Sequence, residues 1–131
     1  MLAIERLREL LPTICDRETS QDPEGWTPDN PLWGHCAVVA LIVQDYFGGD
    51  LLRASLKGTP WFPQNVSHYW NRLPDGTKVD LTEDQFGDSY PTLPDPIIRT
   101  REYVLSYPAT VKRCELLKAR LAKAIEEGRL P

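Results

Sequence analysis

Apolar residues recur every three or four positions at both ends of the chain, among charged residues. This spacing predicts an amphipathic helix at each end. We expect the N-terminal helix to be broken or kinked near Pro12, because proline removes a helical hydrogen bond, and the C-terminal helix to be closed by Gly128. The apolar stripe of the first helix consists of Leu2, Leu7, Leu10, Leu11 and Ile14. The stripe of the second consists of Val111, Cys114, Leu117, Leu121 and Ile125.

The middle of the chain predicts a buried helix followed by an antiparallel sheet. The segment CAVVALIVQDYF begins at Cys36, is apolar on nearly every face and ends at Gly48-Gly49, as a central helix with a glycine stop would. Residues 50–56, 67–73 and 77–81 have the patterns of strands and are separated by turn-rich segments. The spacing Thr82-x-x-Gln85 is that of a capping box and predicts a short helical turn after the third strand.

Two proline-rich segments without periodicity, residues 16–35 and 87–100, predict long loops. Trp26 and Trp33 indicate that the first loop is pinned to the body of the protein. Whether it covers Cys36 as a lid or wraps the far side of the domain is left open by its composition.

Length and composition favour one folded domain. A chain of 131 residues can bury a core without disulfides or a metal, so we expect a single domain over residues 1–131. Hydrophobic residues make up 41% and charged residues 26%, which disfavours disordered, coiled-coil and membrane classes. The predicted fold class is α+β: an N-terminal helix, a central buried helix that carries Cys36 and packs on a small antiparallel sheet, and a C-terminal helix.

Charge and targeting signals bear on partners and location. The net charge of −4 disfavours nucleic acid and anionic membranes as partners. The longest unbroken apolar run, Cys36 to Val43, is far shorter than the roughly 20 residues that cross a bilayer. Charged residues occupy the place where a signal peptide needs an apolar stretch, so we expect a cytoplasmic protein. The three cysteines are odd in number and far apart, which predicts free thiols: Cys15, Cys36 and Cys114.

The turn Pro74-Asp75-Gly76 predicts the register of the second and third strands. Its composition is that of a three-residue hairpin with a bulge, which places Trp70 opposite Asp80 on one side of the sheet. His68 lies on the same side, and His68 and Asp80 become diagonal neighbours, roughly 7 to 8 Å apart at the backbone. Their side chains can close that gap.

The predicted pair of His68 and Asp80, together with Cys36 at the start of the buried helix, predicts a catalytic triad. In the first turn of a helix, free amide groups and the helix dipole favour a thiolate over a thiol at Cys36. Gly34 leaves room above the sulfur, and the Cys36 amide could hold an oxyanion. In this constellation Cys36 attacks an acyl carbon, His68 transfers protons and Asp80 orients the imidazole. No metal and no cofactor are required.

Five short motifs occur in a fixed order along the chain: Asn30-Pro31, Gly34-x-Cys36-Ala37, Gly48-Gly49, Ser67-His68-x-x-Asn71 and Asp80-Leu81-Thr82. In these motifs, and over most of residues 26–120, the chain resembles the YunG-like family of small bacterial proteins. More distantly, a cysteine that opens a helix, a histidine on a strand and an aspartate on the next strand are similar in order to the core of transglutaminase-like and papain-like cysteine enzymes.

The resemblance also implies an amide side chain near the nucleophile. Where many relatives are expected to have Gln before the cysteine, this chain has His35, which puts an oxyanion role of that side chain in doubt. Asn30 is the nearest amide candidate for such a role. Trp33, Trp61 and Trp70 would either line a substrate cleft or anchor core and loops, since tryptophan is heavily buried on average.

Simpler interpretations stand beside the triad. A free cysteine at the start of an apolar helix is most often a packing residue, which is the expectation for Cys15 and Cys114. His35, Cys36, His68 and Asp80 are ligand types that zinc accepts, but no metal-binding spacing is present. Three arginines could surround a carboxylate-bearing substrate, although at this net charge a solvated or salt-bridged surface is the simpler interpretation: Arg99, Arg101 and Arg113.

Two functional hypotheses follow from the sequence. The first is a cysteine-dependent hydrolase or acyltransferase acting on an amide, thioester or isopeptide bond of a peptide, protein or small acyl substrate. The second is a catalytically inactive binding or regulatory domain on the same scaffold, for which Cys36 would be unreactive. The sequence leaves the substrate, the choice between hydrolysis and transfer, and the oligomeric state open.

Overall fold

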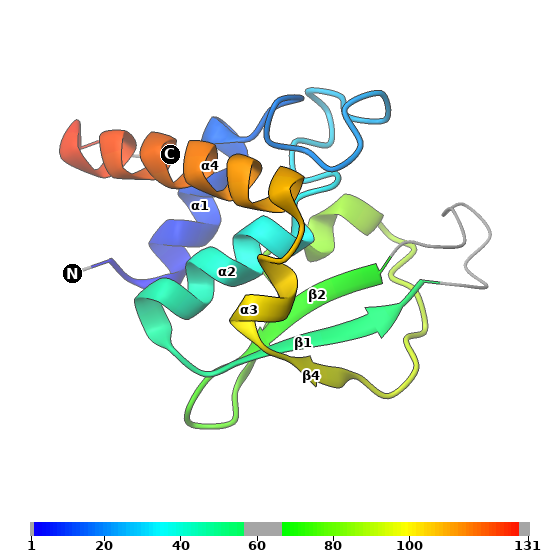
Figure 1. Cartoon of the computed structure of the whole chain (residues 1–131). Coiled ribbons are helices and arrows are strands. Elements are labelled where there is room, and N and C mark those ends of the chain that lie inside the picture. Colours follow the sequence, from blue (N-terminus) through cyan, green and yellow to red (C-terminus); the bar gives the residue numbers. More distant parts are fainter. Residues whose placement is uncertain (1, 57–66, 129–131) are drawn as a thin grey trace.

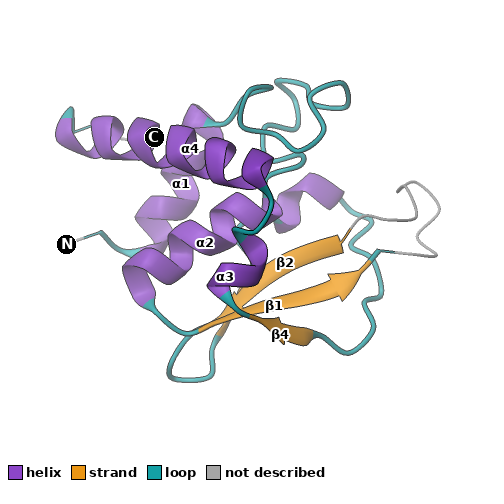
Figure 2. Ribbon diagram, viewed as in Figure 1, coloured by secondary structure: helices purple, strands orange, loops and turns teal. Residues whose placement is uncertain are grey.

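The computed structural model describes residues 2–56 and 67–128 (Figure 1). Four α-helices lie on one side of a four-stranded antiparallel sheet in this part of the chain (Figure 2). The helices are α1 (Ile4–Ile14), α2 (Cys36–Phe47), α3 (Arg101–Val104) and α4 (Pro108–Glu126), and a 3-10 helix, η1, spans Glu83–Phe86. The strands are β1 (Asp50–Ser55), β2 (Ser67–Arg72), β3 (Lys78–Val79) and β4 (Ile97–Arg99).

Helix α2 forms the middle layer of the molecule. It packs on β1 and β2 on one side and on α4 on the other, and α1 contacts α4 in the outer layer (Figure 1). Most of its residues are buried, as its continuous apolar sequence predicts. Within the described residues, no helix is long and apolar enough to cross a bilayer.

The end of α2 is set by two glycines with positive φ, Gly48 and Gly49. A Cβ at Gly49 would collide with the Arg72 carbonyl of β2, so only glycine allows helix and sheet to approach this closely. The preceding residue of β2, the buried Asn71, donates from Nδ2 to the Ala40 carbonyl of α2 at 3.0 Å. The two contacts fix α2 against the sheet.

The sheet order is β3-β2-β1-β4, with every neighbouring pair antiparallel. Asn71 lies opposite Val79 and Arg72 opposite Lys78, which confirms the register expected from the Pro-Asp-Gly turn. Leu73 N–H donates to the Thr77 carbonyl at 2.8 Å, and Gly76 has φ +90°. The short β3 leaves Asp80 just beyond the paired residues.

The two faces of the sheet have different surroundings. Leu51 and Val79 belong to the main core under α2, which α1 and α4 complete. Leu52, Ala54 and Trp70 form a second, smaller cluster on the opposite face, against which Leu93 packs. Strand alternation places His68 on the same face as Trp70.

Several details of the sequence prediction are wrong. Of the two alternatives for Pro12, a break or a kink, the break is wrong: α1 runs on to Ile14, because its four buried residues pack into the core on both sides of the proline. The predicted turn after the third strand exists as η1, but the Thr82 side chain forms no cap hydrogen bond. Residues 87–100, expected to be a loop throughout, contain β4. Helix α3 was not predicted.

Candidate active site

Cys36 is the first residue of α2, and its side chain is almost completely buried. Its Sγ donates a hydrogen bond to the Ser67 carbonyl at 3.6 Å, which joins the start of α2 to the start of β2. The first helical hydrogen bond of α2 runs from Val39 N–H to the His35 carbonyl. The N–H groups of Cys36 and of the next two residues therefore precede the helical hydrogen bonds.

His68 and Asp80 form a buried pair. His68 Nε2 lies 2.6 Å from Asp80 Oδ2, and the side chains are 0% and 2% exposed. The same carboxylate oxygen accepts from the Tyr90 hydroxyl at 2.7 Å, while Oδ1 accepts from the Thr82 hydroxyl at 3.4 Å. With these three donors the carboxylate is held in a fixed orientation toward the imidazole.

The electrostatics of this pair favour a charged imidazole. Burial alone would lower the pKa of His68, but the hydrogen bond to Asp80 and the contact with Cys36 raise it to about 9. Burial would raise the pKa of Asp80, and the hydrogen bond from His68 holds it below its ordinary value instead. Burial and the bond to Asp80 raise the pKa of Tyr90, which keeps the phenol protonated as a donor.

The second ring nitrogen, His68 Nδ1, is buried, and no atom of the described residues meets the distance and angle of a hydrogen bond to it. Cys36 is nevertheless one of the two residues whose interaction with the ring raises the His68 pKa. Catalytic hydrogen bonds are often long or poorly aligned in unliganded sites and tighten with substrate. The arrangement is a thiol on one side of an imidazole and a carboxylate on the other.

Aromatic rings fix the plane of the imidazole. Trp70 stacks on it with ring centroids 5.6 Å apart and an angle of 24°. Phe86 of η1 meets its edge at 4.9 Å, and Tyr90 does so at 6.0 Å. Trp70 is thus a support for His68 on the face of the sheet away from α2, while also lying under the Lys78 ammonium at 5.6 Å.

Gln85 links η1 to the turn before Cys36. Its Oε1 accepts from Gly34 N–H at 3.3 Å, and its backbone carbonyl accepts from Asn30 Nδ2 at 2.9 Å. Gly34 has φ +78°, and a Cβ there would collide with Ser20. The Asn30 amide, the candidate oxyanion donor, is thereby engaged in holding the loop against η1.

Sequence reasoning missed Gln85 and Tyr90 as parts of the site. The Thr82-x-x-Gln85 spacing indicates only a capping box, and the available signal for a role in the site is an amide side chain three residues after the Asp80-Leu81-Thr82 motif. Gln85 Nε2 is buried with no partner among the described residues. No sequence signal indicates a role of Tyr90 in the site, because nothing in the pattern of residues 87–100 distinguishes it from the other residues of that segment.

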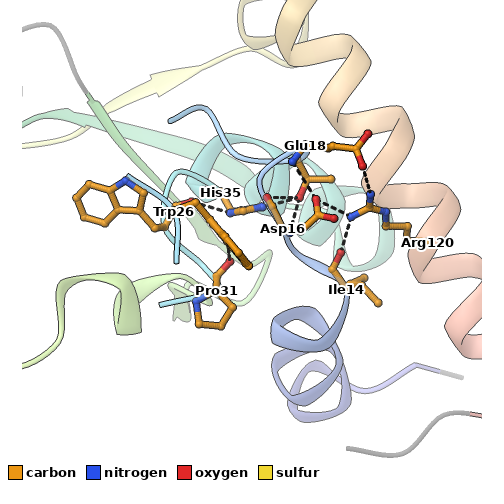
Figure 3. Close-up of polar contacts among 9 residues, drawn as sticks. Ile14, Asp16, Glu18, Trp26, Pro31, His35 and Arg120 are labelled. Atoms are coloured by element: carbon orange, nitrogen blue, oxygen red, sulfur yellow. Dashed lines mark hydrogen bonds and ion pairs between the residues drawn. The ribbon is translucent and has the colours of Figure 1, made fainter. Parts of the chain in front are cut away.

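His35 serves the loop of residues 16–35. Its ring is 0% exposed; Nε2 lies 2.7 Å from the Thr19 hydroxyl and Nδ1 lies 2.8 Å from the Trp33 carbonyl. Figure 3 shows the ring directed to the segment of Asp16, which Arg120 of α4 also reaches. Both ring nitrogens are occupied, so the geometry gives His35 a loop-anchoring position and leaves no ring donor for an oxyanion.

The tryptophans of the loop anchor it, as expected. Trp26 is buried and its Nε1 donates to the Pro31 carbonyl at 2.8 Å (Figure 3). The half-buried Trp33 donates from Nε1 to Asp22 at 3.0 Å. Trp61 lies outside the described residues. Among the residues that the structure describes, no cluster of three or more His, Cys, Asp or Glu side chains could hold a metal ion.

The three cysteines are free thiols, as expected, and all are buried. Burial raises the pKa of Cys15 to about 12, and it also raises that of Cys114. Both belong to the main hydrophobic core, whereas Cys36 lies at its margin beside His68. Only Cys36, among these, has an imidazole next to it.

Fold and site together define a small α+β protein in which a cysteine at a helix start meets a buried histidine–aspartate pair. Residues 3–126 match the family described as "YunG protein", and the chain belongs to this family. It is similar to the uncharacterized protein YunG of Bacillus subtilis (strain 168), with 30% identity over 83 residues. That alignment covers 63% of this chain and 63% of the relative. No solved structure matches the chain.

Proposed function

We propose that this protein is a cysteine-dependent hydrolase or acyltransferase that acts on an amide, thioester or isopeptide bond. The observation that carries the proposal is the buried His68–Asp80 pair, 2.6 Å apart, next to a thiol at the start of α2. A buried ion pair costs desolvation energy that apolar side chains would avoid, so its position beside a nucleophile favours a chemical role.

The proposed reaction has two steps. The Cys36 thiolate attacks the carbonyl carbon, the bond to the leaving nitrogen or sulfur breaks, and the His68 imidazolium donates its proton to that leaving group. Water or an amine then attacks the thioester carbon, His68 accepts its proton, and Cys36 leaves as a thiolate. Asp80 stabilises the imidazolium and fixes the ring, and the backbone N–H groups at the start of α2 are the available donors for the oxyanion.

The order of elements also supports this proposal. A cysteine opens the helix, the histidine lies on the following sheet and the aspartate comes directly after the next strand. In this order the protein resembles the core of papain-like and transglutaminase-like enzymes, and we propose the same arrangement of roles here. His35, Asn30 and Trp33 take no direct part, since their side-chain donors or acceptors serve the loop before Cys36.

The burial of Cys36 favours a second candidate function, that of a non-catalytic binding domain. Only 6% of the residue is exposed, whereas an enzyme must bring its sulfur to a substrate. On this alternative the histidine–aspartate pair would be a structural element of the small second cluster, and Cys36 would react slowly.

Alkylation with iodoacetamide, resolved by mass spectrometry at each cysteine, distinguishes the two. We expect Cys36 to react at pH 6.5 at least tenfold faster than Cys15 and Cys114, which are matched internal controls because both are buried core thiols. The rate at Cys36 should fall at least tenfold in His68→Gln and His68→Ala, with folding checked by circular dichroism. Uniformly slow labelling of folded protein would contradict the enzyme proposal and favour the binding domain.

A further inference from the structure

A pocket of about 340 Å³ lies beside the candidate nucleophile. Two of its lining residues are chain neighbours of the site: Ala37 follows Cys36 in α2, and Ser67 precedes His68 in β2. The Ser67 carbonyl is also the group that accepts the Cys36 thiol hydrogen. The pocket therefore lies next to the contact between Cys36 and Ser67, and its volume is in the range of small-ligand sites.

The charge of this pocket is opposite to that of the chain. Arg53 of β1 and Arg113 of α4 line it, and no acidic side chain does so among the described residues. Neither guanidinium forms an ion pair with a described carboxylate, although four other arginines do so: Arg8, Arg72, Arg101 and Arg120. Two uncompensated cations in one concave site, in a protein of net charge −4, indicate an anionic ligand.

Arg113 connects the pocket to the site. Its Nε is buried and has no partner among the described residues, and one of its terminal nitrogens donates to the Thr110 hydroxyl at 3.3 Å. Burial lowers its pKa, and the opposing interaction comes from Cys36, so this guanidinium lies within electrostatic reach of the sulfur. The guanidinium lines the pocket without a carboxylate partner among the described residues, and a planar guanidinium suits a carboxylate that binds there.

Tyrosines complete the lining. Tyr69 lies directly opposite Arg53 on the neighbouring strand, so the two side chains stand side by side on the α2 face of the sheet. Tyr103 and Tyr107 close the pocket from α3 and the start of α4, with ring centroids 6.3 Å apart. Phenol hydroxyls can donate hydrogen bonds to carboxylate oxygens, as the guanidinium groups of the same lining can.

We propose that this pocket binds the carboxylate of a small anionic acyl substrate, held by Arg53 and Arg113, with the reacting carbonyl at Cys36. The inference rests on the proposed function and specifies its substrate class. The corresponding substrates are amides or thioesters of short dicarboxylic acids, or peptides that end in a carboxylate close to the scissile bond.

The test compares two alkylating probes of equal reach and different charge, N-iodoacetyl-β-alanine and its N-methylamide. In each case the Cys36 sulfur forms a thioether and iodide leaves. In the folded protein we expect the anionic probe to react with Cys36 at least tenfold faster than the neutral probe. The same chain unfolded in urea gives the reference ratio, which electrostatic repulsion between thiolate and probe should keep at or below one.

The ratio of the two rates should fall at least fivefold in Arg53→Gln and in Arg113→Gln. Any change in thiolate reactivity common to both probes cancels in this ratio. Arg72→Gln is the matched control: it removes an exposed guanidinium that pairs with Asp50 outside the pocket, and the ratio should stay as in the wild type. Rising ionic strength should reduce the preference.

The outcomes separate this inference from the proposed function. Fast neutral labelling of Cys36 with a ratio at or below the unfolded reference would overturn the anionic pocket and leave the triad standing. A preference that persists unchanged in both pocket variants would overturn it as well. Slow neutral labelling at Cys36 would overturn the proposed function and, with it, the substrate class.

Discussion

Asp80 should be the residue that keeps His68 protonated. Replacing it with asparagine retains the size and a hydrogen-bond acceptor but removes the negative charge next to Nε2. His68 would then be a buried imidazole with the desolvation that lowers its pKa and without the hydrogen bond to a carboxylate, the largest of the effects that raise it. Because the contact with Cys36 remains, we expect its pKa to fall from about 9 to near the ordinary value of 6.5.

The magnitude follows from the linkage between pKa and free energy. A pKa of about 9 against 6.5 corresponds to about 3 kcal/mol, or a factor of about 300, in favour of the imidazolium. At pH 7.5 the wild type would then hold nearly all His68 protonated, and Asp80→Asn would hold only a small fraction. An imidazolium beside the sulfur stabilises a thiolate, so the alkylation rate of Cys36 should fall with it.

Imidazole NMR titration measures this directly, because the chain contains two histidines. His35 is an internal reference, because its pKa is shifted in the opposite direction: burial lowers it. Its hydrogen-bond partners lie in the loop of residues 16–35. We expect one histidine to titrate well above 6.5 and the other below it. Asp80→Asn should move only the former.

Asp84→Asn is the matched control, since it makes the same chemical change at an exposed position of η1. It should leave both histidine titrations unchanged. The reasoning would be refuted by a wild-type His68 that titrates at or below 6.5, or by an Asp80→Asn protein in which its pKa stays near 9.

Three further predictions concern stability, each read from urea denaturation. The pKa of His68 is higher in the folded protein than in the unfolded chain, so its protonation stabilises the fold by about 3 kcal/mol below pH 6.5, and this stabilisation is lost as the pH rises through about 9. The difference in free energy of unfolding between wild type and His68→Gln should therefore shrink over this pH range. A difference that stays constant with pH would contradict this. Gly34→Ala should lower the free energy of unfolding by about 1 to 3 kcal/mol or more and slow Cys36 alkylation. Gly76→Ala is the control: Gly76 also has positive φ but lies in open space, so this change should cost less stability and leave the alkylation rate unchanged. Tyr90→Phe should cost about 1 kcal/mol through the lost bond to Asp80, against no loss in the exposed Tyr46→Phe control.

The sequence was sufficient for the parts of the fold that depend on local rules. The glycine pair ends α2 where expected, and the Pro74-Asp75-Gly76 turn determines the register that brings Asp80 to the His68 side of the sheet. Turn chemistry and strand alternation act over a few residues, so they can be read from the chain directly.

The parts that the sequence did not predict depend on tertiary contacts. Strand β4 lies in a proline-rich segment, and its isoleucines, Ile97 and Ile98, are exposed. It forms because its backbone pairs with the edge of β1, a contact that its own sequence does not indicate. Gln85 is part of the site because η1 folds back on the turn at Gly34, across 51 positions of sequence. Arg53 and Arg113 come together from β1 and α4, and no periodicity connects two such distant positions.

The candidate site lies where the two hydrophobic clusters of the protein meet, the main core under α2 and the smaller cluster on the opposite face of the sheet. The main core positions α2 and therefore Cys36, while the rings around His68 belong to the opposite face of the sheet. The sulfur and the imidazole are held in place by contacts that tie the start of α2 to the sheet and to η1: the Cys36 bond to Ser67, the Asn71 bond to Ala40 and the Gly34 bond to Gln85. A change that shifts α2 slightly along the sheet should therefore impair the reactivity of Cys36 while either cluster, and the cooperative fold, stays intact.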